Sequence, residues 1–284
     1  MRIDVTHGKG SAPMKYKAVA VTDQGPYRKT NQDSVLIREK YIRGNKIVLA
    51  VLCDGMGGLE YGEIASRMAV DSFEKWFDDF LTQAAELPSK EKMIHDWKRL
   101  IADINIEIYN YAASVSTQIG TTLTAMILFE NHYVIGHVGD SRIYLINKDK
   151  ISQLTEDHSL VAQEVRKGVL SSAQAKTDKR RHLLVKSVGV KSVVDPQFIS
   201  GEINKFDAYL LCSDGLWNKV EENEMQQEIL ADNCAVEHLI QSARSKNEKD
   251  NISVITVIEE KKMSFGLAAI AVVIAVIITW IIFT

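Results

Sequence analysis

Three aspartates stand at the ends of apolar, strand-like runs. Asp54 follows IVLAVLC and Asp214 follows AYLLCS, each with a glycine next in sequence, whereas Asp250 and Asn251 precede ISVITVI. One Asp-Gly after a strand commonly marks only a turn. Three such aspartates are harder to explain as turns, because strand ends can converge on one edge of a fold. Clustered carboxylates repel one another unless cations neutralise them, and oxygen ligands without histidine suit Mg²⁺ or Mn²⁺.

Two further polar pieces could add to such a site. The segment DQGPYRKTNQDS, residues 23–34, lies between two predicted strands. Its Arg28 can donate two hydrogen bonds to a phosphate, and its Asp33 could bind metal or order metal-bound water. The second piece is Gly139-Asp140-Ser141-Arg142, which is predicted to lie in a hairpin. Taken alone, the charges of residues 23–34 would be solvated, and residues 139–142 would be a simple β-turn.

The elements that must position these residues come in runs. The residues from Ile64 to Phe80 and from Met93 to Tyr111 show helical spacing of apolar side chains, with a break at Pro88 and Ser89. Strands and helices that do not alternate strictly predict an α+β fold of antiparallel sheets with helices on their outer faces. The strands are predicted at 16–22, 33–38, 47–53, 121–129, 132–138, 142–146, 150–154, 193–199, 207–213 and 251–258, further helices at 221–230 and 233–245, and a helical or irregular stretch at 156–182.

The bulk composition excludes several classes of protein. The 284 residues are 46% hydrophobic and 25% charged, which is enough apolar material for a sizeable core. The net charge is −3 without a long basic block, so nucleic-acid binding has no electrostatic support. Cys53, Cys212 and Cys234 are widely spaced and indicate reduced cysteines in a cytosolic domain. The histidines are scattered and do not match the spacing of a histidine-based zinc site.

The two ends of the chain differ from its middle. Residues 1–14 are polar and broken by glycine and proline, and we expect a flexible tail there, followed by one domain over residues 15–260. Residues 264–283 carry no charge, and as a helix they would span about 30 Å, the thickness of bilayer hydrocarbon. The alternative is a buried core helix, but the segment is apolar on every face.

The apolar segment predicts a single-pass C-terminal anchor, residues 264–284, contacting membrane lipid. Lys261 and Lys262 before it place the domain in the cytoplasm by the positive-inside rule. Because the segment ends the chain, we expect a tail anchor that is inserted after synthesis.

The order and spacing of these pieces resemble the metal-dependent protein phosphatases, the type 2C serine/threonine phosphatases. The resemblance is collinear from Lys17 to Val257. One motif would be weak, but seven in the same order are specific. The motifs are TDQGPYRKTNQDS, VLCDGMGGLEYGEIAS, GTTLTAMIL, HVGDSRIYL, LTEDHS, LLCSDGLW and KDNISVITV.

The resemblance implies a four-layer α-β-β-α sandwich, in which helix pairs flank two antiparallel sheets and a two-metal centre lies at one end. It implies hydrolysis of phosphoserine and phosphothreonine in proteins by direct attack of a metal-bridging hydroxide, with Mn²⁺ or Mg²⁺ as cofactor. A membrane serine/threonine kinase is one candidate partner. The implied metal ligands are Asp54, the Gly55 carbonyl, Asp214 and Asp250, with Asp140 at a weaker third metal, while Arg28 would hold the phosphate and Asp33 metal-bound water.

The chain departs from the family pattern at three positions. Met56 stands where some members have a histidine proposed as general acid, and Gln32 replaces an acidic residue. Asn218 replaces an aspartate, which weakens the expected third metal. His158 matches the family and is interpreted as structural.

Two other classes of function remain to be weighed. The chain could be a catalytically weak or inactive scaffold that binds a membrane partner, although a scaffold has no physical need to keep mutually repelling acids. A nucleotide-binding protein is excluded by the missing GxxxxGK[ST] and GxGxxG patterns.

Overall fold

The computed structural model describes residues 16–42, 45–57, 61–83, 87–205, 207–231 and 235–259. Within these ranges, no helix is both long and apolar enough to cross a bilayer. The predicted tail, 1–14, and the predicted membrane helix, 264–284, lie outside the described residues.

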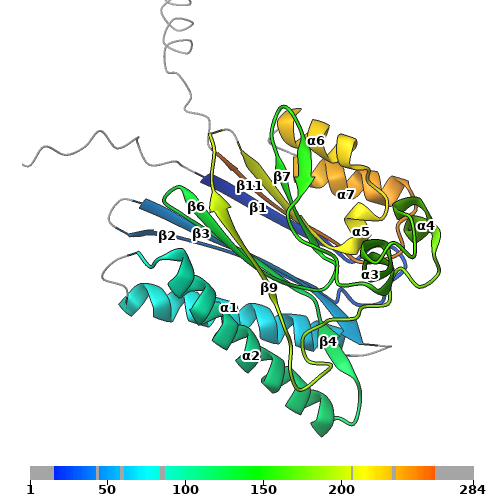
Figure 1. The fold of residues 1–284 in the computed structure, drawn as a ribbon, viewed down its shortest axis with the longest axis horizontal. Helices are drawn as coiled ribbons and strands as arrows, with labels where there is room; N and C mark the ends of the chain where they lie inside the picture. The colour runs from blue at the N-terminus through cyan, green and yellow to red at the C-terminus, as the bar shows by residue number, and fades with distance from the viewer. Residues whose placement is uncertain are drawn as a thin grey trace, which may run out of the picture.

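Two antiparallel sheets form the centre of the described structure (Figure 1). One sheet has the order β1-β11-β10-β7-β8, and the other has the order β2-β3-β5-β6-β9, with β4 paired to β3. The strands of the first sheet are β1 Tyr16–Asp23, β7 Arg142–Ile146, β8 Ile151–Gln153, β10 Ala208–Cys212 and β11 Ile252–Glu259. Those of the second are β2 Asp33–Ile42, β3 Asn45–Gly57, β4 Ile119–Thr121, β5 Leu123–Phe129, β6 His132–Val138 and β9 Gln197–Glu202.

Helix pairs cover the outer faces of both sheets, as Figure 1 shows. Helices α1 Gly62–Gln83 and α2 Lys90–Ser114 bury their apolar stripes on the second sheet, and Ser89 caps α2 through a bond from the Lys92 N–H. Helices α6 Glu222–Ala231 and α7 Ala235–Ser245 cover the first sheet. A third apolar cluster fills the space between the sheets. Three cores therefore separate four layers, as the α+β prediction requires.

Three short helices lie near one end of the sandwich. Helices α3 Leu160–Arg166 and α4 Ser172–Thr177 fall inside the stretch predicted to be helical or irregular. Helix α5 Asp214–Trp217 begins directly after β10, where the sequence showed only an Asp-Gly turn signal.

The predicted hairpin at residues 139–142 is wrong. Strand β6 ends at Val138 in one sheet, and β7 begins at Arg142 in the other, so this short connection crosses between sheets. Gly139 has a φ of 115°, which permits the change of direction that a residue with a side chain rarely adopts.

The strand predicted at 193–199 is displaced to Gln197–Glu202. Pro196 has no N–H for a ladder, and Val193 is 79% exposed, so the apolar residues before Pro196 do not join the sheet.

Candidate active site

Strand ends from both sheets bring the aspartates together. Asp33 opens β2 and stands directly opposite Asp54 of β3 in the antiparallel register. Asp214 follows β10 and Asp250 precedes β11, and these two strands are antiparallel neighbours in the other sheet. Because the end of one antiparallel strand meets the start of the next, all four carboxylates reach the same end of the sandwich.

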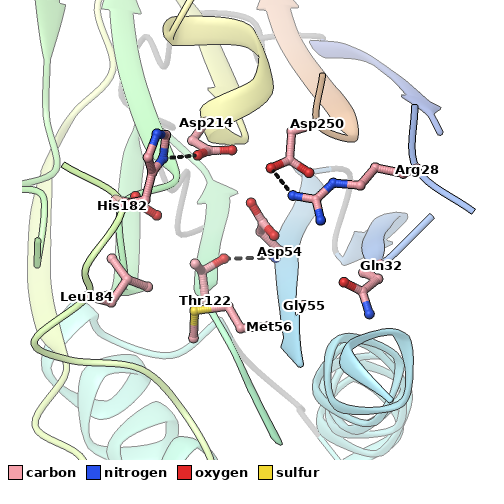
Figure 2. Close-up of a pocket in the computed structure, with 11 residues that line it drawn as sticks. Arg28, Gln32, Asp54, Gly55, Met56, Thr122, His182, Leu184, Asp214 and Asp250 are labelled. Atoms are coloured by element: carbon pink, nitrogen blue, oxygen red, sulfur yellow. Dashed lines mark hydrogen bonds and ion pairs between the residues drawn. The ribbon is translucent and has the colours of Figure 1, made fainter. Parts of the chain in front are cut away.

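A pocket of about 480 Å³ opens at this end (Figure 2). Six of the seven site residues expected from the sequence line it, and the seventh, Asp33, is buried beside Asp54. The lining residues are Arg28, Gln32, Asp54, Gly55, Met56, Thr122, Asp140, His182, Leu184, Asp214 and Asp250.

Backbone contacts fix the Asp54-Gly55 segment tightly. The Asp54 N–H donates to the Thr122 hydroxyl at 2.8 Å, and the Thr122 N–H returns a bond of 2.8 Å to the Asp54 carbonyl. The Gly55 N–H donates to the Gln32 carbonyl at 3.1 Å. A side chain at Gly55 would overlap the carbonyl oxygen of Gly62, so only glycine lets the chain pass here.

Arg28 reaches the pocket from the loop between β1 and β2. Its Nη2 lies 2.6 Å from Oδ2 of Asp250, a bond that raises the pKa of the guanidinium, and half of its side chain is exposed. Figure 2 shows this pair on one wall of the pocket. The remaining guanidinium donors can therefore face a bound anion.

Asn251 holds the Arg28 loop against the start of β11. Its Oδ1 accepts the N–H of Gln32 at 2.9 Å, and its Nδ2 donates to the carbonyls of Gln24 and Thr30 at 2.8 and 3.2 Å. The side chain is buried, so these bonds replace water for all of the groups involved. Sequence reasoning quoted Asn251 within a motif and gave it no role.

Burial and mutual repulsion perturb the carboxylates strongly. Burial raises the pKa of Asp33 to about 7, and the neighbouring carboxylates of Asp214 and Asp250 add to the rise. Burial, followed by the charges of Asp33 and Asp214, raises the pKa of Asp54 well above its usual range. Burial and Asp214 do the same for Asp140. Such shifts are typical of carboxylates that carry out chemistry or bind ions.

The donor set fits a pair of hard divalent cations. Both oxygens of Asp33 and Oδ1 of Asp214 are buried without a hydrogen-bond partner within the described residues. In the same part of the chain, no group of three His, Cys, Asp or Glu side chains closes around a single point. Carboxylate, backbone carbonyl and water oxygens are the usual ligands of Mg²⁺.

The three departures from the family pattern all lie in or beside the pocket. Met56 lines it and offers no proton. Gln32 donates to Glu63 at 3.2 Å, and Asn218 donates to Oδ2 of Asp214 at 3.3 Å.

Sequence reasoning missed three lining residues. Thr122 belongs to a quoted motif, GTTLTAMIL, but carried no assigned role. His182 and Leu184 come from the segment between α4 and β9, and Nδ1 of His182 lies 3.5 Å from Oδ2 of Asp214. No spacing in that segment marks them. His158 does not line the pocket, and its Nδ1 accepts the Gly139 N–H at 3.1 Å, in keeping with a structural role.

Comparison with known proteins agrees with this geometry. A family model described as Protein phosphatase 2C matches residues 28–249. Serine/threonine phosphatase Stp of Listeria innocua is 36% identical over 242 residues, which make up 83% of this chain and 93% of that protein. The crystal structure of serine/threonine phosphatase Stp1 from Staphylococcus aureus has a TM-score of 0.79 and 32% identity, with 91% of this chain and 100% of that chain covered.

A second solved structure supports the cofactor. The catalytic domain of the serine/threonine protein phosphatase PstP in complex with two manganese ions has a TM-score of 0.72 and 26% identity, with 87% of this chain and 99% of that chain covered. The chain therefore belongs to the protein phosphatase 2C family, whose members depend on Mn²⁺ or Mg²⁺. Within that family it is a serine/threonine phosphatase similar to the bacterial Stp proteins.

The perturbed carboxylates predict that metal-free protein loses stability as pH rises from 6.5 to 8.5. A buried carboxyl with a folded pKa of about 7 binds its proton more tightly than in the unfolded chain. The resulting contribution to stability is fully present below the ordinary pKa of 3.8 and falls as pH rises toward the folded pKa, so its last part is lost between pH 6.5 and 8.5. His137 and His158, whose pKa values burial lowers to about 3 and 4, act oppositely but only below about pH 6.5.

Thermal unfolding in EDTA and in excess Mn²⁺ measures the effect. We expect the Mn²⁺-induced rise in Tm to be larger at pH 8.5 than at pH 6.5, because ionised carboxylates bind the cation. Asp33→Asn should flatten the decline in EDTA. A Tm in EDTA that is constant across this range would contradict the prediction.

Proposed function

We propose that this member of the protein phosphatase 2C family dephosphorylates serine and threonine in proteins at the cytoplasmic face of a membrane. The observation that supports the site assignment is the convergence of Asp54, Asp140, Asp214, Asp250 and Arg28 on one pocket. An acidic floor with an arginine on its wall suits a phosphate held over cations.

Each residue has a distinct part in the proposed reaction. Asp54, Asp214, Asp250 and the Gly55 carbonyl would hold the two principal cations, with Asp140 at a weaker third. When bound, such cations activate water for in-line attack on phosphorus and offset the charge that develops on the phosphoryl oxygens.

Side chains of the protein would bind the phosphate and order water. Arg28 binds and orients the phosphate, and its bond to Asp250 keeps the guanidinium beside the acidic floor. Asp33 is buried beside Asp54, and its carboxylate oxygens would accept hydrogen bonds from metal-bound water. Met56 cannot donate a proton, so this position cannot supply the general acid that a histidine there would provide.

A scaffold that only binds a membrane partner is the competing function. Hydrolysis that depends on the carboxylates would distinguish a phosphatase from a scaffold.

We predict that residues 1–262 hydrolyse phosphothreonine peptides with Mn²⁺ or Mg²⁺ and lose that activity in EDTA. Asp54→Asn and Asp214→Asn should each lower kcat by several orders of magnitude, since each removes a proposed ligand. Asp149→Asn, in the exposed turn between β7 and β8, is the control. Full activity in excess EDTA would overturn the metal-dependent mechanism.

Arg28→Ala should mainly weaken phosphate binding. A lost charged hydrogen bond costs roughly 1.5–3 kcal/mol, which predicts a fall in kcat/KM of about 10- to 150-fold, with a larger change in KM than in kcat. Arg38→Ala is the matched control, because Arg38 pairs with Glu74 on α1, away from the pocket lining. If Arg28→Ala leaves KM unchanged, Arg28 is not the phosphate ligand.

The membrane part of the proposal is supported by residues 264–283, an uncharged apolar run as long as the bilayer hydrocarbon is thick. Lys261 and Lys262 favour a cytoplasmic domain. The segment from 260 to 263 is short, so the domain would act on phosphoproteins close to the membrane, a serine/threonine kinase of the same membrane among them.

We predict that removing residues 264–284 releases the protein into the soluble fraction with kcat unchanged, because the proposed metal ligands all precede Glu259. Fractionation and phosphopeptide hydrolysis measure both properties. Protease added to right-side-out vesicles should leave the domain intact, whereas its digestion would reverse the orientation. Extraction of the full chain by alkaline carbonate without detergent would show that the segment does not span the bilayer.

A further inference from the structure

The segment at the edge of the pocket is strongly basic although the chain as a whole is acidic. Residues 160–191 contain eight Lys or Arg and two Asp or Glu, a net charge of +6, whereas the full chain has a net charge of −3. This segment includes α3 and α4 and enters the pocket through His182 and Leu184. Three of these cations pair with acids outside the segment, namely Arg166 with Glu156, Lys176 with Glu221 and Lys186 with Asp195. The positive charge that remains nearest the pocket lies in the turn that carries His182.

Part of this positive charge lies in a compact turn, residues 178–183, beside the pocket mouth. Residues 178–183 contain two overlapping backbone hydrogen bonds, from the N–H groups at 181 and 183 to carbonyls three residues earlier. The turn is held near the pocket by His182, whose Nδ1 lies 3.5 Å from Oδ2 of Asp214 (Figure 2). Every residue of the turn therefore lies within a few residues of a pocket-lining side chain.

Two cations of the turn have no acidic partner within the described residues. Arg180 is neutralised by Glu164 and Asp178, both at 2.8 Å. Lys179 is exposed and Arg181 is partly exposed, and neither forms an ion pair in that part of the chain. Both are available to bind an external anion.

The other side of the pocket mouth, formed by residues next to Arg28 and Asp250, also carries positive charge. Lys29 follows Arg28 and is exposed. Lys249 precedes Asp250, and its Nζ lies 6.0 Å from the ring centre of Tyr27, which is itself 57% exposed. A peptide crossing the mouth would therefore meet positive charge on both sides of its phosphorylated residue.

We propose that this phosphatase selects phosphopeptides in which acidic residues flank the phosphorylated one. Lys179 and Arg181, in the turn at residues 178–183, would bind those acidic residues. The inference rests on the proposed function. Cations bound among the carboxylates at the bottom of the pocket would neutralise them. The electrostatic field at the pocket mouth would then depend on the cationic side chains of Lys179, Arg181, Lys29 and Lys249. Complementary charge at an exposed rim speeds association and rejects like-charged partners.

Three phosphothreonine peptides of equal length, with acidic, neutral or lysine flanks, test the proposal on the full chain in detergent with Mn²⁺. The measurement is the ratio of kcat/KM for the acidic peptide to that for the basic one. Exposed ion pairs are weak, so we expect a ratio of roughly three to ten, falling toward one between 50 and 500 mM NaCl. The double substitution Lys179→Glu and Arg181→Glu should abolish or invert it. Because the ratio is taken within one variant, a general loss of activity does not move it.

Two control variants make the test specific. Lys148→Glu with Lys150→Glu changes the charge equally in the β7–β8 turn, at the end of β7 far from Asp140, and should leave the ratio unchanged. Lys179→Arg with Arg181→Lys should preserve it.

The outcomes also separate this proposal from the proposed function. Hydrolysis of all three peptides at equal rates would overturn the acidic preference alone. Failure to hydrolyse any of them would overturn the proposed function. An unchanged ratio in the charge-reversed variant would overturn the assignment to this turn. The same holds if that variant binds phosphatidylglycerol vesicles more weakly while its peptide ratio is unchanged, because the turn would then bind lipid and not the peptide.

Discussion

Mutual repulsion among buried carboxylates is the constraint on which this end of the molecule depends. Asp33, Asp54 and Asp140 all have raised pKa values, first because burial removes their water and then because neighbouring carboxylates oppose ionisation. A charged group left uncompensated in such a place costs several kcal/mol. A bound cation converts this destabilisation into stabilisation, because the closely spaced carboxylates that repel one another are also ligands that attract a metal ion. The arrangement is tolerable without metal only because two sheets with separate apolar cores hold the strand ends in place.

The loops between those strand ends need their own support, because they carry residues that are proposed to bind the substrate. Asn251 supplies much of it by binding three backbone groups of the Arg28 loop while its own backbone lies against Gly215, where a side chain would overlap the Asn251 carbonyl. A rigid loop loses little conformational entropy when phosphate binds. Arg28 and Asp250 are thus paired, so the position of the proposed phosphate ligand depends on the position of a proposed metal ligand.

The sequence predicted the parts of this structure that local patterns encode. Aspartates after or before apolar runs identified the strand ends, and the periodicity of residues 93–111 identified α2. The path at Gly139 was not predictable, because a short link between strands usually forms a hairpin and nothing local signals a change of sheet. His182 was missed for a related reason. Its place is set by distant backbone bonds that join the segments around residues 158–160 and 183–185.

Two of the three departures from the family pattern relieve the same repulsion. Gln32 and Asn218 are amides where the family has acids, and in the structure each donates to a carboxylate, Glu63 and Asp214 respectively. An amide at either position removes one negative charge from a crowded site and adds a hydrogen-bond donor to the neighbouring carboxylate. The gain has a functional cost, because a third cation beside Asp140 would lose a charged ligand at position 218 and would compete with Asn218 for Asp214. Relief of repulsion and tight binding of a third metal therefore oppose one another in this chain, and the residues present favour the former.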